Sequence, residues 1–150
     1  MYSTEIMEFV VSSSEKVEGE VPVVAAIAVG LDVLTICTNQ VERRNKVWAH
    51  AEFLAIQKAC DILDTKYLDK ASMYVNLEPC AFCASALEKV RINEIFFGAY
   101  DEKCGAIVHG IRLFDQSMIK PKIIGGIQER RCSEIIRNFF INIRKERKNE

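Results

Sequence analysis

Hydrophobic positions along the chain follow two spacings, one typical of helices and one typical of strands. Four segments have apolar residues at helical spacing: residues 4–17, 50–63, 80–90 and 129–148. Five short β-branched or alternating runs predict strands: residues 21–29, 33–38, 72–77, 94–99 and 122–127. The remaining segments predict a polar loop over 39–47, a Gly-containing loop over 101–110 and a short helix over 111–116.

The order of these elements predicts an α/β fold. Strands separated by single helices form parallel pairs joined by right-handed crossovers, whereas the first two strands are joined by a short turn and pair antiparallel. We therefore expect one domain over residues 1–150, a three-layer α/β/α sandwich with a five-stranded mixed sheet. In the last helix, five apolar residues are expected to face inward: Ile135, Ile136, Phe139, Phe140 and Ile143.

Composition excludes several classes of protein. Apolar residues make up 49% of the chain and charged residues 27%, the balance of a globular domain. Seven Gly and three Pro in 150 residues are too few for a collagen or a disordered chain. The longest apolar run, residues 21–30, is too short to span a bilayer and contains Pro22.

Charge is balanced over the whole chain but not along it. Residues 1–20 hold five Glu and one Lys, while residues 130–150 hold seven Lys and Arg against three Glu. A basic end on a neutral protein is compatible with a polyanionic partner. It is equally compatible with a solvated helix end.

The six cysteines are interpreted by their context. The chain begins without the basic and apolar pattern of a secretory signal, since Glu5 and Glu8 interrupt its apolar residues. A reducing, cytoplasmic location is therefore expected, where close cysteine pairs more often bind metal than form disulfides.

Two helix starts carry candidate metal ligands. His50 opens one helix, and Cys80 and Cys83 open the next, three residues apart and on one helix face. Backbone N–H groups and the helix dipole favour thiolates there, and thiolate is the form that binds zinc. Three ligands leave a fourth position for water, as in catalytic zinc sites. A closed structural site completed by another cysteine is the alternative.

Glu52 is placed to act beside such a metal without binding it. It lies two residues after His50, and a carboxylate next to a zinc site can move protons for an attacking water. Taken alone, it would be an ordinary acidic residue in a first helical turn. Together, H-x-E and P-C-x-x-C about 30 residues later form the known zinc deaminase pattern.

Longer motifs carry a resemblance to one family. They are Asn39, His50-Ala51-Glu52, Leu77–Ala84 (LEPCAFCA), Phe97–Ala106 (FGAYDEKCGA) and Phe139-Phe140. Over about residues 4–145 the chain resembles the bacterial tRNA-specific adenosine deaminases, members of the cytidine deaminase-like superfamily.

The resemblance implies deamination of adenosine to inosine at the wobble position of an arginine tRNA anticodon, by a homodimer. It also implies the residue roles. His50, Cys80 and Cys83 would hold zinc, and Glu52 would move protons. Asn39 would bind the flipped base, with the Ala51 backbone nearby. Asp101 would contact the RNA backbone.

The chain departs from the family pattern outside the metal ligands. Val24, Val47-Trp48, the segment ending in His109, and Ile141 replace the family's usual residues. His109 is interpreted as a surface or structural residue, with an RNA contact as the alternative. Phe82 is interpreted as a core residue, with a pocket wall as the alternative. Trp48 is open between base stacking and core packing. Glu78 is interpreted as a positioning residue.

Two other functions remain open at this point. A zinc-dependent deaminase of free purine bases or nucleosides, such as guanine, would share the metal motifs. A catalytically idle RNA-binding subunit would share the basic C-terminal end. An intact Glu52 argues against the idle subunit, because that residue has a purpose only in the chemistry.

Overall fold

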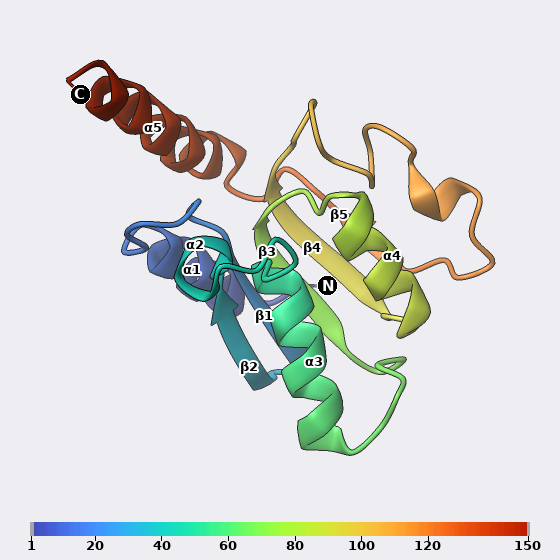
Figure 1. Cartoon of the computed structure of the whole chain (residues 1–150). Coiled ribbons are helices and arrows are strands. Elements are labelled where there is room, and N and C mark those ends of the chain that lie inside the picture. Colours follow the sequence, from blue (N-terminus) through green and yellow to red (C-terminus); the bar gives the residue numbers. More distant parts are fainter. Residues whose placement is uncertain (1, 150) are drawn as a thin grey trace.

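The computed structural model describes residues 2–149 (Figure 1). Its elements are, in chain order, α1 (Thr4–Ser14), β1 (Val24–Val29), β2 (Asp32–Thr38), α2 (Val41–Arg44), α3 (Ala51–Leu63), β3 (Ser72–Leu77), α4 (Ala81–Lys89), β4 (Glu94–Ala99), η1 (Leu113–Asp115), β5 (Lys122–Ile124) and α5 (Glu129–Lys148).

One sheet organises the chain. Its strand order is β2-β1-β3-β4-β5, with β1 antiparallel to both neighbours and β3, β4 and β5 parallel to one another. The predicted five-stranded mixed sheet is confirmed. Strand β2 runs in the same direction as β3, as the single intervening helix predicts, but the two are not neighbours because β1 lies between them.

Helices cover both faces of the sheet, as the predicted three layers require. Helices α3 and α4 pack on one face, over a core that includes Leu54, Met73 and Phe97. Helix α1 and the start of α5 pack on the other, over a core that includes Met7, Phe96 and Cys132. Successive side chains of each strand point alternately into the two cores. Because both faces are buried, the central strands are almost continuously apolar.

Three predicted boundaries agree with the structure without change, those of β3, β4 and α5. The first helix ends at Ser14 instead of residue 17, and the last strand at Ile124 instead of residue 127. Strand β1 begins at Val24 because Pro22 has no N–H for a strand ladder. The predicted short helix over 111–116 is the 3₁₀ turn η1.

The loop predicted over residues 39–47 contains a short helix, α2, so the loop prediction is wrong there. The buried carboxylate of Glu20 accepts hydrogen bonds from the backbone N–H groups of Glu42 and Arg43, both at 2.8 Å. It satisfies N–H groups that a helix start leaves without partners. The stabilising residue is more than twenty positions away, which is why the local pattern does not show it.

Helix α5 also differs from its predicted packing. Cys132 is its only buried residue, Ile135 and Ile136 are half-buried, and Phe140 is 44% exposed, so Phe140 does not face inward as expected. Figure 1 shows why: the helix begins at the edge of the sheet and its later turns project away from the body. Salt bridges from Arg131 to Glu8 and Glu15 hold its first turns against α1. Among the described residues, no helix has the length and apolarity that crossing a bilayer requires.

Candidate active site and metal centre

The candidate site residues gather at one edge of the sheet. Because β2, β3 and β4 run in the same direction, their carboxyl ends meet at that edge. Asn39 follows β2, Cys80 follows β3 and Asp101 follows β4. Open α/β sheets place their ligand sites at such carboxyl ends.

Two helix N-caps meet the third ligand at this edge. His50 caps α3 and Cys80 caps α4, and neither side chain makes a capping hydrogen bond. Instead, the His50 Nδ1 lies 3.7 Å from the Cys80 Sγ and 3.6 Å from the Cys83 Sγ. Metal bonds of about 2.3 Å to sulfur and 2.0 Å to nitrogen place tetrahedral ligands about 3.5 Å apart. The three donor atoms therefore fit the edges of a zinc tetrahedron.

The protonation states of this group also favour a cation. A hydrogen bond from the Cys83 thiol lowers the pKa of Cys80 to about 4, despite its partial burial. The same bond, together with burial, raises the pKa of Cys83. The hydrogen bond with Cys80 raises the pKa of His50. Without a metal, the two sulfurs thus share one negative charge, and a divalent cation would supply the positive charge that stabilises both as thiolates.

Glu52 lies beside this group. The residue is 5% exposed, and burial raises its pKa to about 7, although a hydrogen bond from its own backbone N–H, the charge of His50 and a hydrogen bond from Cys83 oppose the shift. A carboxyl with a pKa near neutral pH can both accept and return a proton. The first-turn position on α3 places its carboxyl next to the ligands while its backbone starts the helix.

The other cysteines lie elsewhere. Within residues 2–149, the one group of three or more metal-ligating side chains is His50, Cys80 and Cys83. Cys37 and Cys132 are buried in separate cores on the two faces of the sheet, and Cys104 is exposed. The described residues therefore bring together the open three-ligand arrangement, and they do not bring a fourth cysteine to it.

Asn39 and Asp101 are held by the backbone around them. The Asn39 amide donates to the Val21 carbonyl at 3.3 Å, and its oxygen accepts from the Val41 N–H at 3.3 Å. One carboxylate oxygen of Asp101 accepts from the N–H groups of Lys103 and Cys104, so this side chain shapes its own turn. Ala51 is fully buried as the first residue of α3.

Glu78 has a much larger role than sequence reasoning gave it. The residue is 2% exposed, and its carboxylate accepts hydrogen bonds from the backbone N–H groups of Asp101, Ile107, Val108 and His109, at 2.8–3.1 Å. Burial raises its pKa, but these bonds outweigh burial and hold the pKa below its ordinary value. The signal in the sequence was an acidic residue directly before P-C-x-x-C.

One aromatic side chain covers the His50 ring, and two more pack behind it. Phe82 lies edge-on to His50 with centroids 5.9 Å apart, and Phe53 contacts both Phe82 and Trp48. Phe82 is 43% exposed, so its interpretation as a core residue is wrong: it covers His50 at the surface. Trp48 packs edge-on against Phe53, and the Arg44 guanidinium lies 5.5 Å from its ring.

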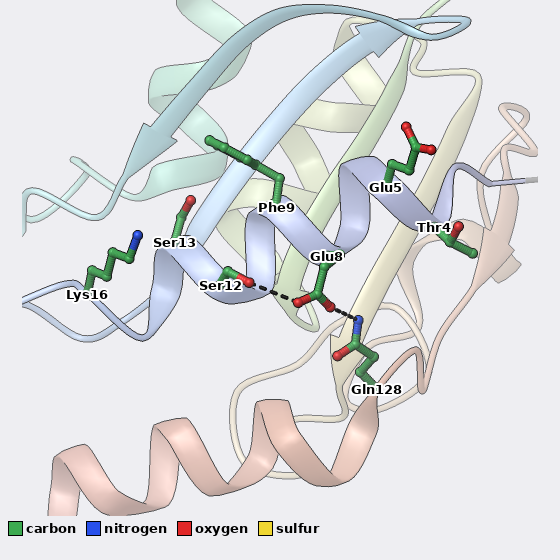
Figure 2. Close-up of a pocket in the computed structure, with 8 residues that line it drawn as sticks. All are labelled: Thr4, Glu5, Glu8, Phe9, Ser12, Ser13, Lys16 and Gln128. Atoms are coloured by element: carbon green, nitrogen blue, oxygen red, sulfur yellow. Dashed lines mark hydrogen bonds between the residues drawn. The ribbon is translucent and has the colours of Figure 1, made fainter.

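A separate open pocket of about 650 Å³ lies along α1 and is bordered by Gln128, the N-cap of α5 (Figure 2). Glu5 and Glu8 line it, with Lys16 as its one basic residue and the exposed Phe9 beside them. It lies on the α1 face of the sheet, away from the ligand group, and its acidic lining does not suit a polyanion.

Comparison with known proteins agrees with this geometry. The sequence profile of the MafB19-like deaminases matches residues 4–144. The chain belongs to the MafB19-like deaminase family. This deaminase is 36% identical to the tRNA-specific adenosine deaminase of Rickettsia typhi over 131 residues, which are 85% of this chain and 88% of that one. The resemblance found in its sequence is thereby confirmed.

Solved structures show the same fold. A structure from work on A-to-I editing by tRNA:A34 deaminases matches 89% of this deaminase and 99% of that chain, with a TM-score of 0.84 and 34% identity. A guanine deaminase from Nitrosomonas europaea matches 90% of this deaminase and 80% of that chain, with a TM-score of 0.74 and 18% identity. The second likeness shows the fold alone.

Proposed function

We propose that this deaminase converts adenosine to inosine at the wobble position of a tRNA anticodon. One observation carries the proposal: the buried Glu52 carboxyl lies beside three metal-ligating side chains that leave a coordination position free. The tRNA-specific adenosine deaminase of Rickettsia typhi, at 36% identity, supports tRNA as the substrate. The guanine deaminase is similar only in fold.

The proposed chemistry divides between one ion per chain and the residues around it. His50, Cys80 and Cys83 would hold zinc, which would supply a Lewis acid that makes a water molecule acidic near neutral pH. Glu52 takes one proton from the water that attacks C6 of adenine and delivers it to N1. It then takes the proton of the new C6 hydroxyl and delivers it to the departing ammonia.

Three further residues complete the proposed substrate site. Asn39 hydrogen-bonds the flipped base. The Ala51 backbone, at the start of α3, lies near that base. Asp101 contacts the RNA backbone with the carboxylate oxygen that its own turn leaves free. Support comes from their common position at the carboxyl edge of the sheet.

The RNA outside the pocket would meet the end of α5. We name Arg144, Lys145, Arg147 and Lys148 the basic tail; all four are exposed on the part of α5 that projects from the body. Strand β5 is parallel to β4, so α5 starts from the same edge of the sheet as the ligand group. A basic surface at that edge suits a phosphate backbone.

The remaining parts of the proposal follow from the same function. The substrate is an arginine tRNA, the location is the cytoplasm where tRNA acts, and the active form is a homodimer. Exposed apolar side chains near the site, Trp48 and Phe82, are available to a second copy. Analytical ultracentrifugation would show a 17.0 kDa species if the protein is monomeric and twice that mass if the dimer forms.

The test compares anticodon stem-loops that carry adenosine at the wobble position with loops that carry it one position away. Digestion and mass spectrometry of the products measure inosine at each position. We expect inosine at the wobble position only, and none with Glu52→Gln. Inosine from free adenosine or xanthine from guanine, with no reaction on the stem-loop, would contradict the proposal and support the small-substrate deaminase.

A further inference from the structure

The loop after β4 is built around one buried carboxylate. Both Glu78 oxygens accept hydrogen bonds: Oε1 from the Asp101 N–H and the His109 ring, and Oε2 from three successive backbone N–H groups that end at His109. Backbone N–H groups can only donate, and four of them point at the two Glu78 oxygens. These bonds favour the ionised carboxylate and hold the pKa of Glu78 below its ordinary value. Glu78 is therefore ionised and acts only as an acceptor.

This fixes the tautomer of His109. Its Nδ1 lies 2.9 Å from Glu78 Oε1, and because the carboxylate can only accept, Nδ1 carries the proton. In the neutral ring, Nε2 then has a free lone pair. Within the described residues, the His109 Nε2 has no hydrogen-bond partner, whereas every buried side-chain nitrogen or oxygen has one. Nε2 is therefore not buried. In the neutral ring, the Nε2 atom of His109 thus reaches solvent as a hydrogen-bond acceptor.

The loop places this atom near the candidate active site. Gly105 forms an isolated β-bridge with the ligand Cys80, and the Ala106 N–H donates to the Pro79 carbonyl at 3.0 Å. Gly110 turns back against the Gly105 carbonyl so closely that a side chain there would overlap it. His109, directly before Gly110, is thus linked to the Cys80 segment through two short steps.

The packing around Glu78 leaves little freedom for this arrangement. A Cβ added to Gly105 would lie 2.5 Å from the Glu78 carboxyl carbon and 2.5 Å from the Asp101 carbonyl. The His109 ring lies 6.0 Å from the Tyr100 ring, edge-on, and one third of its side chain is exposed. A fixed ring with one exposed acceptor atom is a preorganised binding group.

We propose that His109 accepts a hydrogen bond from a ribose 2′-hydroxyl of the RNA substrate, and that Glu78 is the positioning residue that holds its ring in the required tautomer. The 2′-hydroxyl is the donor that distinguishes RNA from DNA, and the loop is bridged to the Cys80 segment, beside which the target base would bind. The inference rests on the proposed RNA substrate and adds a residue that selects ribose.

The experiment uses anticodon stem-loops in which each loop nucleotide in turn is 2′-deoxy. Inosine formation is measured as kcat and KM for the zinc-loaded enzyme, for His109→Asn and for Ile111→Asn. Asn can still donate to Glu78 from the Nδ1 position, but it places no acceptor at Nε2. Ile111 is 55% exposed and close by in the chain, so Ile111→Asn controls for a new surface amide.

We expect one 2′-deoxy position to raise the KM of the wild type and of Ile111→Asn by about 3- to 10-fold, the effect of one hydrogen bond. His109→Asn should show that increase on the all-ribose loop and no further increase at the same 2′-deoxy position, as a double-mutant cycle requires. Glu78→Gln should lose the same sensitivity while it keeps its zinc.

Two results would overturn the inference. One is a wild type that is active but indifferent to every 2′-deoxy substitution. The other is a His109→Asn enzyme that keeps the full wild-type sensitivity to the 2′-deoxy position. A wild type that forms no inosine on the all-ribose loop would instead contradict the proposed function itself, so the two failures are distinguishable.

Discussion

Replacement of Glu52 by Gln should remove the activity and make the metal-free protein more stable at alkaline pH. Burial raises the pKa of Glu52 from its ordinary 4.5 to about 7 in the folded, metal-free state. A raised carboxyl pKa means that the folded state binds the proton more tightly. Stability is therefore unaffected below about pH 4.5, falls as the pH rises toward 7, and stays reduced above it. The full reduction is about 3 kcal/mol.

Gln keeps the shape of the side chain and carries no charge. At pH 8 the metal-free variant should exceed the metal-free wild type by up to about 3 kcal/mol, or roughly 6–12 °C in Tm for a chain of this length. Near pH 4.5 the difference should be much smaller. The rate of inosine formation should fall by at least about 10²–10⁴-fold at unchanged zinc content, the usual range for loss of an acid–base group.

Urea denaturation of chelator-treated protein at the two pH values measures the stability difference. Glu129→Gln is the matched control, because Glu129 is an acidic first-turn residue on α5 that is exposed. It should lose a few tenths of a kcal/mol at pH 8 and should gain no stability at either pH value. A Glu52→Gln protein less stable than wild type at pH 8 would refute the claim that burial dominates this carboxyl.

Three more outcomes follow from the structure. Cys83→Ala should reduce zinc well below one ion per chain in elemental analysis, because two ligands remain; full zinc would remove Cys83 from the site. Between pH 5 and pH 3 the Tm of wild type should fall further than that of Glu78→Gln, since the lowered pKa of Glu78 supplies stability that is lost as the pH falls; parallel curves would contradict this. Replacement of the basic tail by Gln should flatten the log–log salt dependence of tRNA binding by up to about 3, whereas coincident slopes would show a merely solvated helix end.

Much of the fold could be predicted because its patterns are local. The alternating run of β3 and the amphipathic period of α5 mark their own boundaries. Glu20, in contrast, stabilises α2 from a distant position, and no periodicity shows that contact. The outward course of α5 also could not be predicted, because an apolar stripe indicates which face of a helix is buried but not how far the body beneath it extends.

The candidate site divides in the same way. The ligand group could be predicted from the sequence, because motif spacing and strand direction place two helix starts at one edge of the sheet. These helix starts carry His50, Cys80 and Cys83. The hydrogen-bond network of Glu78 could not be predicted, because four of its five donors are backbone N–H groups. Every residue except proline carries such a group, so the sequence does not show which of them bind Glu78. Side-chain chemistry is visible in a sequence, whereas backbone chemistry becomes visible only in the structure.

The most direct test of the proposed function is a competition in one tube. The zinc-loaded protein receives equal concentrations of free guanine and of an anticodon stem-loop with adenosine at the wobble position, and mass spectrometry follows inosine and xanthine with time. We expect inosine in the stem-loop, no xanthine, and neither product with Glu52→Gln. Xanthine without inosine would contradict the proposed function.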